Sequence, residues 1–451
     1  MKQRLTSAAV LLVLAAFFVV SGAEWINRAG RDTLFFADVN QYYSYLPAAF
    51  LEKDLGFTYA HHYWTNEGQK GREVPKVTMG MALLYSPWFA LGYWEASREA
   101  AANQSLTGYE RPFEKWIHRG SLLYALLAAF LLLQCLYHFF PPLISGLSYL
   151  ALFFGSNLFY YTLSQGEMAH GYLFLLLSAM ILATIRYHQK ESTAWLVLLG
   201  LSLGWAVLIR PTLLIVGLFP LLYGVYDRGS WARKWGLLAR LRWRWGLLFL
   251  AFLAPLLPQL FYWQWAAGDW LFYSYGSEEG FFWMDPQVGK VLFSFRKGWI
   301  IYTPLAVLML LGLLGLYRIR PLRWAIIPLL LLSLYVISSW WDWWYGGCFS
   351  HRAFVHYYPF WLFGLTAVFS WAGQSWRRWV PLSVFVLLAS GLNLQQSRQY
   401  LSSIIHWDGM TREAYFFIWG RSQLSQAEYQ TLDSLIQRPD YEAARSGNRD
   451  Q

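Results

Sequence analysis

Residues 121–161 read SLLYALLAAFLLLQCLYHFFPPLISGLSYLALFFGSNLFYY and contain no aspartate, glutamate, lysine or arginine. Two apolar runs, Ser121–Phe140 and Leu143–Tyr161, meet at the proline pair Pro141-Pro142. Each run approaches the roughly 20 residues that a helix needs to cross a bilayer. The alternating pattern of a membrane β-barrel is absent from the sequence. This stretch therefore predicts two consecutive transmembrane helices that are joined by a tight turn.

The rest of the chain has the same character. Of its 451 residues, 57% are hydrophobic and 14% are charged, whereas soluble domains carry about 25% charged residues. Nine further apolar runs are Leu5–Ala23, Gly171–Ile185, Ala194–Ile209, Thr212–Tyr226, Gly246–Ala266, Trp299–Leu316, Trp324–Trp340, Ala353–Trp371 and Val380–Leu394. The first could also be a signal peptide, and we interpret it as an uncleaved span. We expect an all-α polytopic membrane protein with about eleven transmembrane helices.

Basic residues orient the predicted spans. The loop Asp227–Trp245 holds six basic residues and one acidic residue, and Tyr317–Arg323 holds three arginines. Cytoplasmic loops of membrane proteins collect lysine and arginine, so these loops are expected inside, with the N-terminus. The same bias accounts for the net charge of +10, and no nucleic-acid partner is expected. Residues 1–395 form the predicted transmembrane domain, and residues 396–451 a short polar tail outside.

One apolar stretch, Met79–Trp94, does not fit as a span, because the later basic loops would then face outward. We predict that it is an interfacial helix in the outer leaflet, preceded by a second interfacial helix over Val39–Lys53. The outer loop, residues 24–119, would carry both helices. In the tail, Ser425–Gln437 has the periodicity of a soluble helix.

Several candidate functional residues precede or follow the predicted spans on the outer face. Asp38 stands in FFADVNQYYSYL, residues 35–46, either as a helix N-cap or as a functional carboxylate. Lys76 either snorkels or faces a lipid phosphate. Glu167 and His170 are three residues apart, which suits one helix face, a two-ligand metal site or a polar loop. Arg210 precedes Pro211 at a membrane boundary and needs a cavity or a partner unless it snorkels.

The most unusual stretch is WWDWWYGGCFSHR, residues 340–352. Its aromatic rings could stack on a sugar or enclose a polyprenyl chain, and Arg352 could bind a phosphate bidentately. An interfacial aromatic belt with a turn is the alternative. Residues 293–299, FSFRKGW, add Arg296 and Lys297 to the same face. The predicted spans themselves are nearly free of charge, whereas a transporter tends to place ionisable groups near the bilayer midplane.

In order and sidedness these motifs resemble GT-C-fold glycosyltransferases, which are polytopic enzymes that use polyprenyl-phosphate-linked sugars. The nearest group contains protein O-mannosyltransferases, lipid A aminoarabinose transferases and RgtA/B/C/D-like transferases, and the likeness covers Leu5–Leu394. Residues 37–43, ADVNQYY, resemble the first outer-loop motif, and Lys76 with Gly80 and Pro87 resembles the lysine-containing stretch. Gln165-Gly166-Glu167 occupies the place of the second acidic motif, where many members carry aspartate.

The resemblance implies sugar transfer, with inversion, from a polyprenyl-phosphate donor to a lipid, glycan or protein acceptor outside a bacterial inner membrane. Asp38 and Glu167 would be catalytic, with Asp38 as the base. The implied donor-phosphate residues are Lys76, Arg210, Arg352, Arg296 and Lys297. The implied substrate-pocket residues are Tyr42, Tyr43, His170, Trp341, Asp342, Trp344 and His351. A divalent cation could take part. The alternatives are a lipid-linked glycan transporter or flippase, an O-antigen-ligase-like enzyme, and a membrane scaffold.

Overall fold

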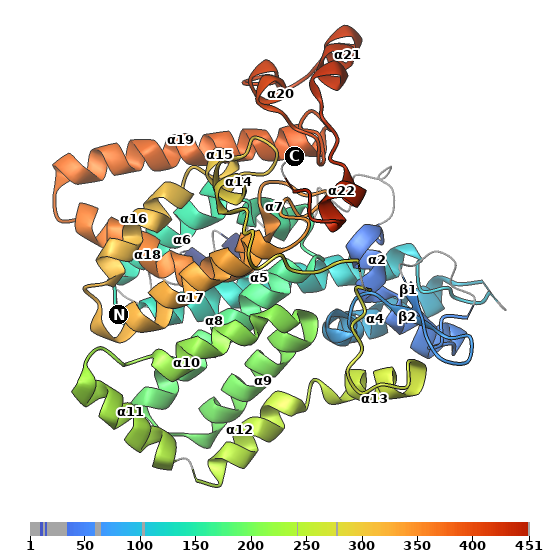
Figure 1. The fold of residues 1–451 in the computed structure, drawn as a ribbon, viewed down its shortest axis with the longest axis horizontal. Helices are drawn as coiled ribbons and strands as arrows, with labels where there is room; N and C mark the ends of the chain where they lie inside the picture. Colours follow the sequence, from blue (N-terminus) through green and yellow to red (C-terminus); the bar gives the residue numbers. More distant parts are fainter. Residues whose placement is uncertain are drawn as a thin grey trace.

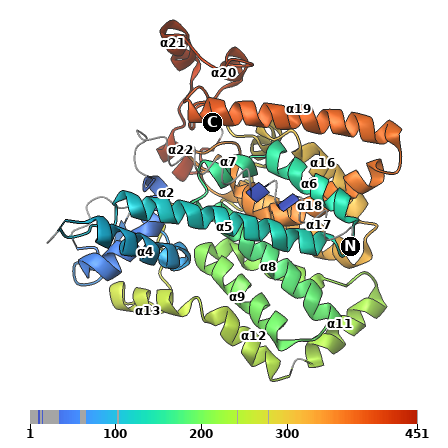
Figure 2. The ribbon, with the colours of Figure 1, turned by 180° about the vertical axis from the view of Figure 1, so that it is seen from behind.

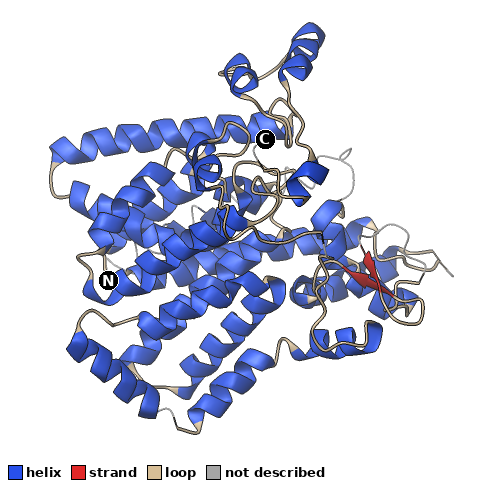
Figure 3. Ribbon diagram, viewed as in Figure 1, coloured by secondary structure: helices blue, strands red, loops and turns tan. Residues whose placement is uncertain are grey.

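The computed structural model describes residues 10–11, 14–15, 34–58, 65–101, 104–240, 242–276 and 278–449. This part of the chain is mostly helical, and its only sheet pairs two short strands (Figure 3). The predicted first span, Leu5–Ala23, lies almost wholly outside the described residues. The all-α character that the apolar runs predicted is therefore confirmed for the described residues.

Three described helices are long and apolar enough to cross a membrane: α5 (Arg111–Leu136), α8 (Ala169–Gln189) and α17 (Arg320–Ser339). The helices α12 (Arg244–Leu253) and α13 (Leu257–Ala266) form a pair bent by 52°, which would be a fourth span if the pair crosses as one. Shorter apolar helices accompany them. By length and composition, the described residues thus support membrane insertion with fewer full-length spans than the expected eleven.

Breaks at proline or small polar residues explain much of the difference. The run Leu143–Tyr161 divides into α6 (Pro142–Gly155) and α7 (Leu158–Leu163). Thr212–Tyr226 begins as the 3-10 helix η2 (Pro211–Gly217) and continues as α10 (Leu218–Leu222). The run Trp299–Leu316 becomes α15 (Trp299–Tyr302) and α16 (Ala306–Leu316), and Ala353–Trp371 becomes η3 (Arg352–Tyr357) and α18 (Tyr358–Ala372). Proline lacks the backbone N–H that would continue a helix, and Pro304 lies in one of these breaks.

The long helices pack side by side (Figures 1 and 2). α5 packs on α8, α8 on α9 (Thr193–Ile209), and α9 on α12, while α6 packs on α19 (Trp376–Leu401). At the contact between α16 and α18, a side chain on Gly312 would collide with the backbone of Gly364. Small residues of this kind let helices approach closely without a water-driven hydrophobic effect.

One end of the bundle carries the elements of the predicted outer loop. These are α2 (Ala37–Tyr43), α3 (Tyr45–Pro47), the π-helix η1 (Ala48–Glu52), β1 (Thr65–Glu67), β2 (Glu73–Pro75) and α4 (Gly80–Glu99). The two strands are antiparallel, with Thr65 opposite Pro75. Helices thus occupy both segments where interfacial helices were predicted. The basic helix α11 (Arg228–Arg240) lies toward the other end of the bundle in both views (Figures 1 and 2).

The C-terminal residues pack on the same end as the outer-loop elements. They form α20 (Arg412–Phe417), α21 (Gln426–Leu435) and α22 (Tyr441–Arg445). α21 falls where the periodicity predicted a helix, and Ser425 and Glu428 close it with a capping box. Contacts from this segment reach the chain around α14 (Val288–Phe293), because Lys290 Nζ donates to the Arg449 carbonyl at 2.6 Å.

Candidate active site

An ion pair between Asp38 and Arg352 joins α2 to the start of η3. The Arg352 guanidinium donates to the Asp38 carboxylate at 2.8 Å, and the two side chains stay 17% and 23% exposed, respectively. The N-cap of α2 is Phe36, and no described side chain caps this helix end. The N-cap interpretation of Asp38 was therefore wrong, and its carboxylate instead pairs with Arg352.

Two tyrosines and a second arginine surround this ion pair. The charges of Asp38, Arg210 and Arg352 all act on the pKa of the Tyr42 and Tyr275 hydroxyls. Burial, and next the Asp38 carboxylate, raise the pKa of the Tyr42 hydroxyl above its ordinary value. Tyr42 therefore remains a neutral hydrogen-bond donor beside a cluster in which two arginines outnumber one carboxylate.

Lys76 extends the cluster on the side of β2. Its ammonium lies 2.7 Å from the Glu279 carboxylate and 5.1 Å from the centre of the Tyr275 ring. Arg445 from the tail approaches the same carboxylate at 3.7 Å. Sequence reasoning assigned neither Glu279 nor Tyr275 to a site. Neither residue belongs to a recognisable motif, so only tertiary structure identifies them.

Asp342 supplies a second carboxyl group near Arg352. Its side chain is 8% exposed, and one carboxyl oxygen has no hydrogen-bond partner among the described residues. Burial raises the pKa of this carboxyl to about 7, although backbone N–H groups of Gly346 and Tyr345 and the Arg352 charge act in the opposite direction. Asp342 can thus exchange a proton near neutral pH, which is typical of functional sites.

Glu167 has a different environment. Its Oε1 lies 2.5 Å from Nδ1 of His118, with both side chains buried, and its carbonyl accepts a hydrogen bond from the Tyr85 hydroxyl. His170 Nδ1 lies 3.5 Å from His356 Nδ1 instead. Glu167 and His170 thus have different partners in the structure. Among the described residues, no three His, Cys, Asp or Glu side chains are grouped to hold a metal ion.

Arg296 and Lys297 connect the tail to the aromatic loop, residues 340–352. Arg296 donates to the Asp408 carbonyl at 2.9 Å, and Lys297 donates to the carbonyls of Trp407, at 2.6 Å, and Cys348. Both cations are buried with these partners. The structure thus places both cations in contact with backbone carbonyls, and the Arg352 charge still acts on Lys297.

The remaining predicted pocket residues divide between the loop and the protein core. Trp341 and Trp344 pack on Tyr441 of the tail, with ring centres 6.1 and 5.6 Å apart. His351 Nε2 donates to the Trp343 carbonyl at 2.9 Å. Tyr43 points away from Tyr42, because its ring stacks on Phe35 at 3.8 Å and its hydroxyl donates to the Gly108 carbonyl. Trp341, Trp344 and His351 thus pack within the aromatic loop and against the tail, and Tyr43 packs within the outer-loop elements. None of the four makes a described contact with Asp38.

No known family model matches the chain, and no curated protein is significantly similar to it in sequence. The charged groups around Asp38 nonetheless suit a particular kind of reaction. A carboxylate beside two arginines, with a lysine close by, can pair proton abstraction with stabilisation of an anionic leaving group. The aromatic rings of residues 340–345 flank this set and could hold a sugar or an isoprenoid chain.

Proposed function

We propose that this protein is a polytopic membrane glycosyltransferase with a GT-C-like fold of about eleven transmembrane helices. It would move a sugar from a polyprenyl-phosphate donor to a lipid, glycan or protein acceptor at the extracytoplasmic face. The single observation that carries the proposal is the partly exposed Asp38–Arg352 ion pair beside Arg210 and Tyr42. The order of the motifs along the chain, which resembles that of GT-C transferases, supports it as well.

The proposed chemistry begins at the ion pair. The donor phosphate competes with Asp38 for Arg352, since guanidinium groups bind phosphate bidentately. Once the phosphate holds Arg352, the Asp38 carboxylate is released and can act as a base. A base that becomes available only with donor in place would limit wasteful hydrolysis of the donor.

In the transfer step, Asp38 accepts the proton of the acceptor hydroxyl. The hydroxyl oxygen forms a bond to the anomeric carbon from the face opposite the phosphate, through an oxocarbenium-like state. The bond from the anomeric carbon to the phosphate oxygen breaks, and its electron pair remains on the lipid phosphate. Arg352 and Arg210 stabilise this developing charge, and Lys76 contributes from the other side of Tyr275.

Reconstitution tests the proposal. Purified protein in liposomes would receive polyprenyl-phosphate-linked hexoses and pentoses together with lipid and glycan acceptors. We expect release of polyprenyl phosphate together with sugar on one acceptor. Movement of intact lipid-linked sugar across the bilayer, without release of polyprenyl phosphate from any donor, would instead establish the transporter alternative.

A further inference from the structure

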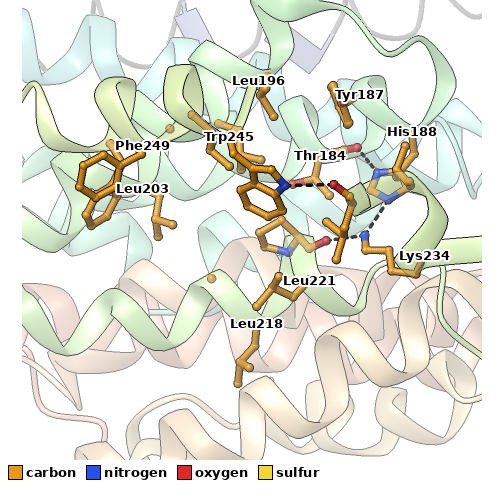
Figure 4. A pocket seen from close by; sticks show the side chains of 18 of the residues that line it. Thr184, Tyr187, His188, Leu196, Leu203, Leu218, Leu221, Lys234, Trp245 and Phe249 are labelled. Atoms are coloured by element: carbon orange, nitrogen blue, oxygen red, sulfur yellow. Dashed lines mark hydrogen bonds between the residues drawn. The ribbon is translucent and has the colours of Figure 1, made fainter. Parts of the chain in front are cut away.

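A large apolar cavity lies at the opposite end of α8 and α9 from the Asp38 cluster. Its volume is about 640 Å³, and it is bounded by α8, α9, η2, α10, α11 and α12 (Figure 4). Residues from the end of α8, such as Thr184 and His188, line the cavity. His170, at the start of α8, lies instead within the electrostatic influence of Arg210 and Arg352. The cavity is therefore a second site, separate from the candidate active site.

The cavity is lined almost entirely by apolar side chains and reaches the surface of the bundle. Three of the lining residues, Leu214, Leu221 and Phe249, are 60%, 46% and 59% exposed. In a membrane-inserted bundle, an apolar opening of this kind faces lipid chains. A leucine-lined space also holds hydrocarbon in preference to water, which needs polar partners.

One end of the cavity carries a buried positive charge. In Figure 4, Lys234 and His188 lie at one end of the cavity, and Phe249 lies at the other. The Lys234 ammonium lies 2.8 Å from His188 Nε2 and donates to the carbonyls of Pro220, at 2.6 Å, and Tyr223, at 3.2 Å. In the part of the chain that the structure describes, no carboxylate pairs with it. A buried charge without a counter-ion is costly, and burial lowers the Lys234 pKa to about 8.

The helix that carries Lys234 has the features of a membrane surface helix. Arg233 and Arg240 are exposed on α11, and so are the rings of Trp231 and Trp235. Tryptophan favours the interface between headgroups and acyl chains, and clustered basic residues attract acidic lipids. The basic residues and the apolar cavity together match a molecule with an anionic headgroup and a hydrocarbon chain.

We propose that this cavity binds an anionic phospholipid, with one acyl chain along the leucine-lined space and the phosphate beside Lys234. Such a lipid would supply the anion that Lys234 lacks and fill a space that water does not favour. The proposal does not depend on glycosyl transfer, since the two sites use different ends of the bundle.

Native mass spectrometry of the full-length protein in detergent tests this site. Dioleoyl phosphatidylglycerol and dioleoyl phosphatidylcholine would be titrated separately, and bound lipids counted. We expect one phosphatidylglycerol to bind roughly fivefold more tightly than phosphatidylcholine, as one basic residue near a lipid surface implies. Lys234→Gln keeps hydrogen-bonding capacity but removes the charge, so this preference should disappear. Leu221→Trp should obstruct the opening and weaken binding of both lipids.

Matched controls lie away from the cavity. Arg377→Gln on the exposed start of α19 and Leu387→Trp, at a residue that is 72% exposed on the same helix, should leave binding unchanged. If Leu221→Trp does not fold, Leu214→Trp serves the same purpose. Equal affinity of the wild type for both lipids would overturn the proposal, as would displacement of the lipid by inorganic phosphate or unaltered binding in the folded tryptophan variant.

Discussion

Asp38 and Arg352 are 314 residues apart in the chain, yet the Arg352 guanidinium donates a 2.8 Å hydrogen bond to the Asp38 carboxylate. The contact closes one end of the helical bundle by joining α2 to η3. Both side chains are mostly buried, at 17% exposure for Arg352 and 23% for Asp38, so leaving either charge without a partner would be costly. An anionic ligand that replaces Asp38 on Arg352 keeps that cation paired.

The first prediction concerns Asp38→Asn. Asparagine keeps the shape of the side chain but cannot accept a proton from an acceptor hydroxyl, so we expect polyprenyl phosphate release to slow by roughly 10²–10⁴-fold. The protein should still fold, because the asparagine side-chain oxygen can still accept the hydrogen bond from Arg352. Asp433→Asn, on an exposed position of α21, is the matched control and should retain full activity. A fully active Asp38→Asn enzyme would eliminate this residue as the base.

The second prediction concerns the cation of the same pair. Arg352→Gln removes charge-assisted bonds worth about 1.5–3 kcal/mol, so KM for the donor should rise by roughly ten- to a hundredfold. Arg412→Gln, exposed on α20, is the control. Combining Arg352→Gln with Asp38→Asn should cost less activity than the product of the two single losses, since the residues are coupled. Strictly multiplicative losses would argue against exchange of Arg352 between carboxylate and phosphate.

The apolar runs predicted where helices lie but not where they break. Most of Ser121–Phe140 lies in α5, which continues without a break to Leu136. Trp299–Leu316 looked equally apolar, yet the helix stops at Thr303 and Pro304. A hydropathy pattern averages over such residues, whereas a helix depends on each N–H in turn.

The site could be predicted only as a set of residues on one face. The motifs placed Asp38, Arg210 and Arg352 on one predicted face, and the structure brings Asp38 and Arg352 into contact. Pairing depends on packing between segments far apart in the chain, so no local signal could assign His118 to Glu167. Arg449 is a further example, since a basic residue in a polar tail looks solvated but is buried here.

The third prediction is a pH dependence caused by Asp342. Its pKa is about 7 in the folded protein, against an ordinary value of 3.8, because the carboxyl is buried. The folded state thus holds the proton to higher pH than the unfolded chain, and stability falls as pH rises from about 4 to about 7. The difference is on the order of 4 kcal/mol, at about 1.36 kcal/mol per pH unit.

The side chain of Asp342→Asn cannot ionise, so the stability of this variant should fall less than that of the wild type as the pH rises. Thermal midpoints of the detergent-solubilised protein at pH 5 and pH 8 measure the effect. We expect the variant to gain stability relative to the wild type on going to pH 8, while Asp433→Asn follows the wild type. An identical pH slope in Asp342→Asn and wild type would mean that Asp342 is ionised throughout.

The fourth prediction separates structural from catalytic roles for Glu167. Breaking a buried pair leaves one partner without its counterpart and costs about 3–5 kcal/mol. Glu167→Gln and His118→Ala should each lower the thermal midpoint, and the double variant should lose less than the sum. Activity per folded molecule should stay within tenfold of the wild type. A normal midpoint with activity as low as that of Asp38→Asn would show that Glu167 is catalytic after all.

The fifth prediction concerns Arg449, whose side chain fastens the tail to the aromatic loop. It donates to the carbonyls of Asp285, Ser338 and Trp340 at 2.5, 2.7 and 2.9 Å. Arg449→Ala removes three hydrogen bonds from a charged donor, each worth about 1.5–3 kcal/mol, although the Ser338 carbonyl keeps its bond from the Gln287 N–H. Backbone amides of residues 340–345 should therefore exchange hydrogen faster, while those of α5 stay protected.

Arg438→Ala provides the control, because Arg438 is exposed in the same tail. It should leave exchange at residues 340–345 unchanged. Since Asp342 and Trp344 lie in this loop, a loosened loop should also raise KM for the donor more than it lowers kcat. Unchanged exchange in Arg449→Ala would show that the loop holds its conformation without the tail, and the tail would then have no part in shaping the site.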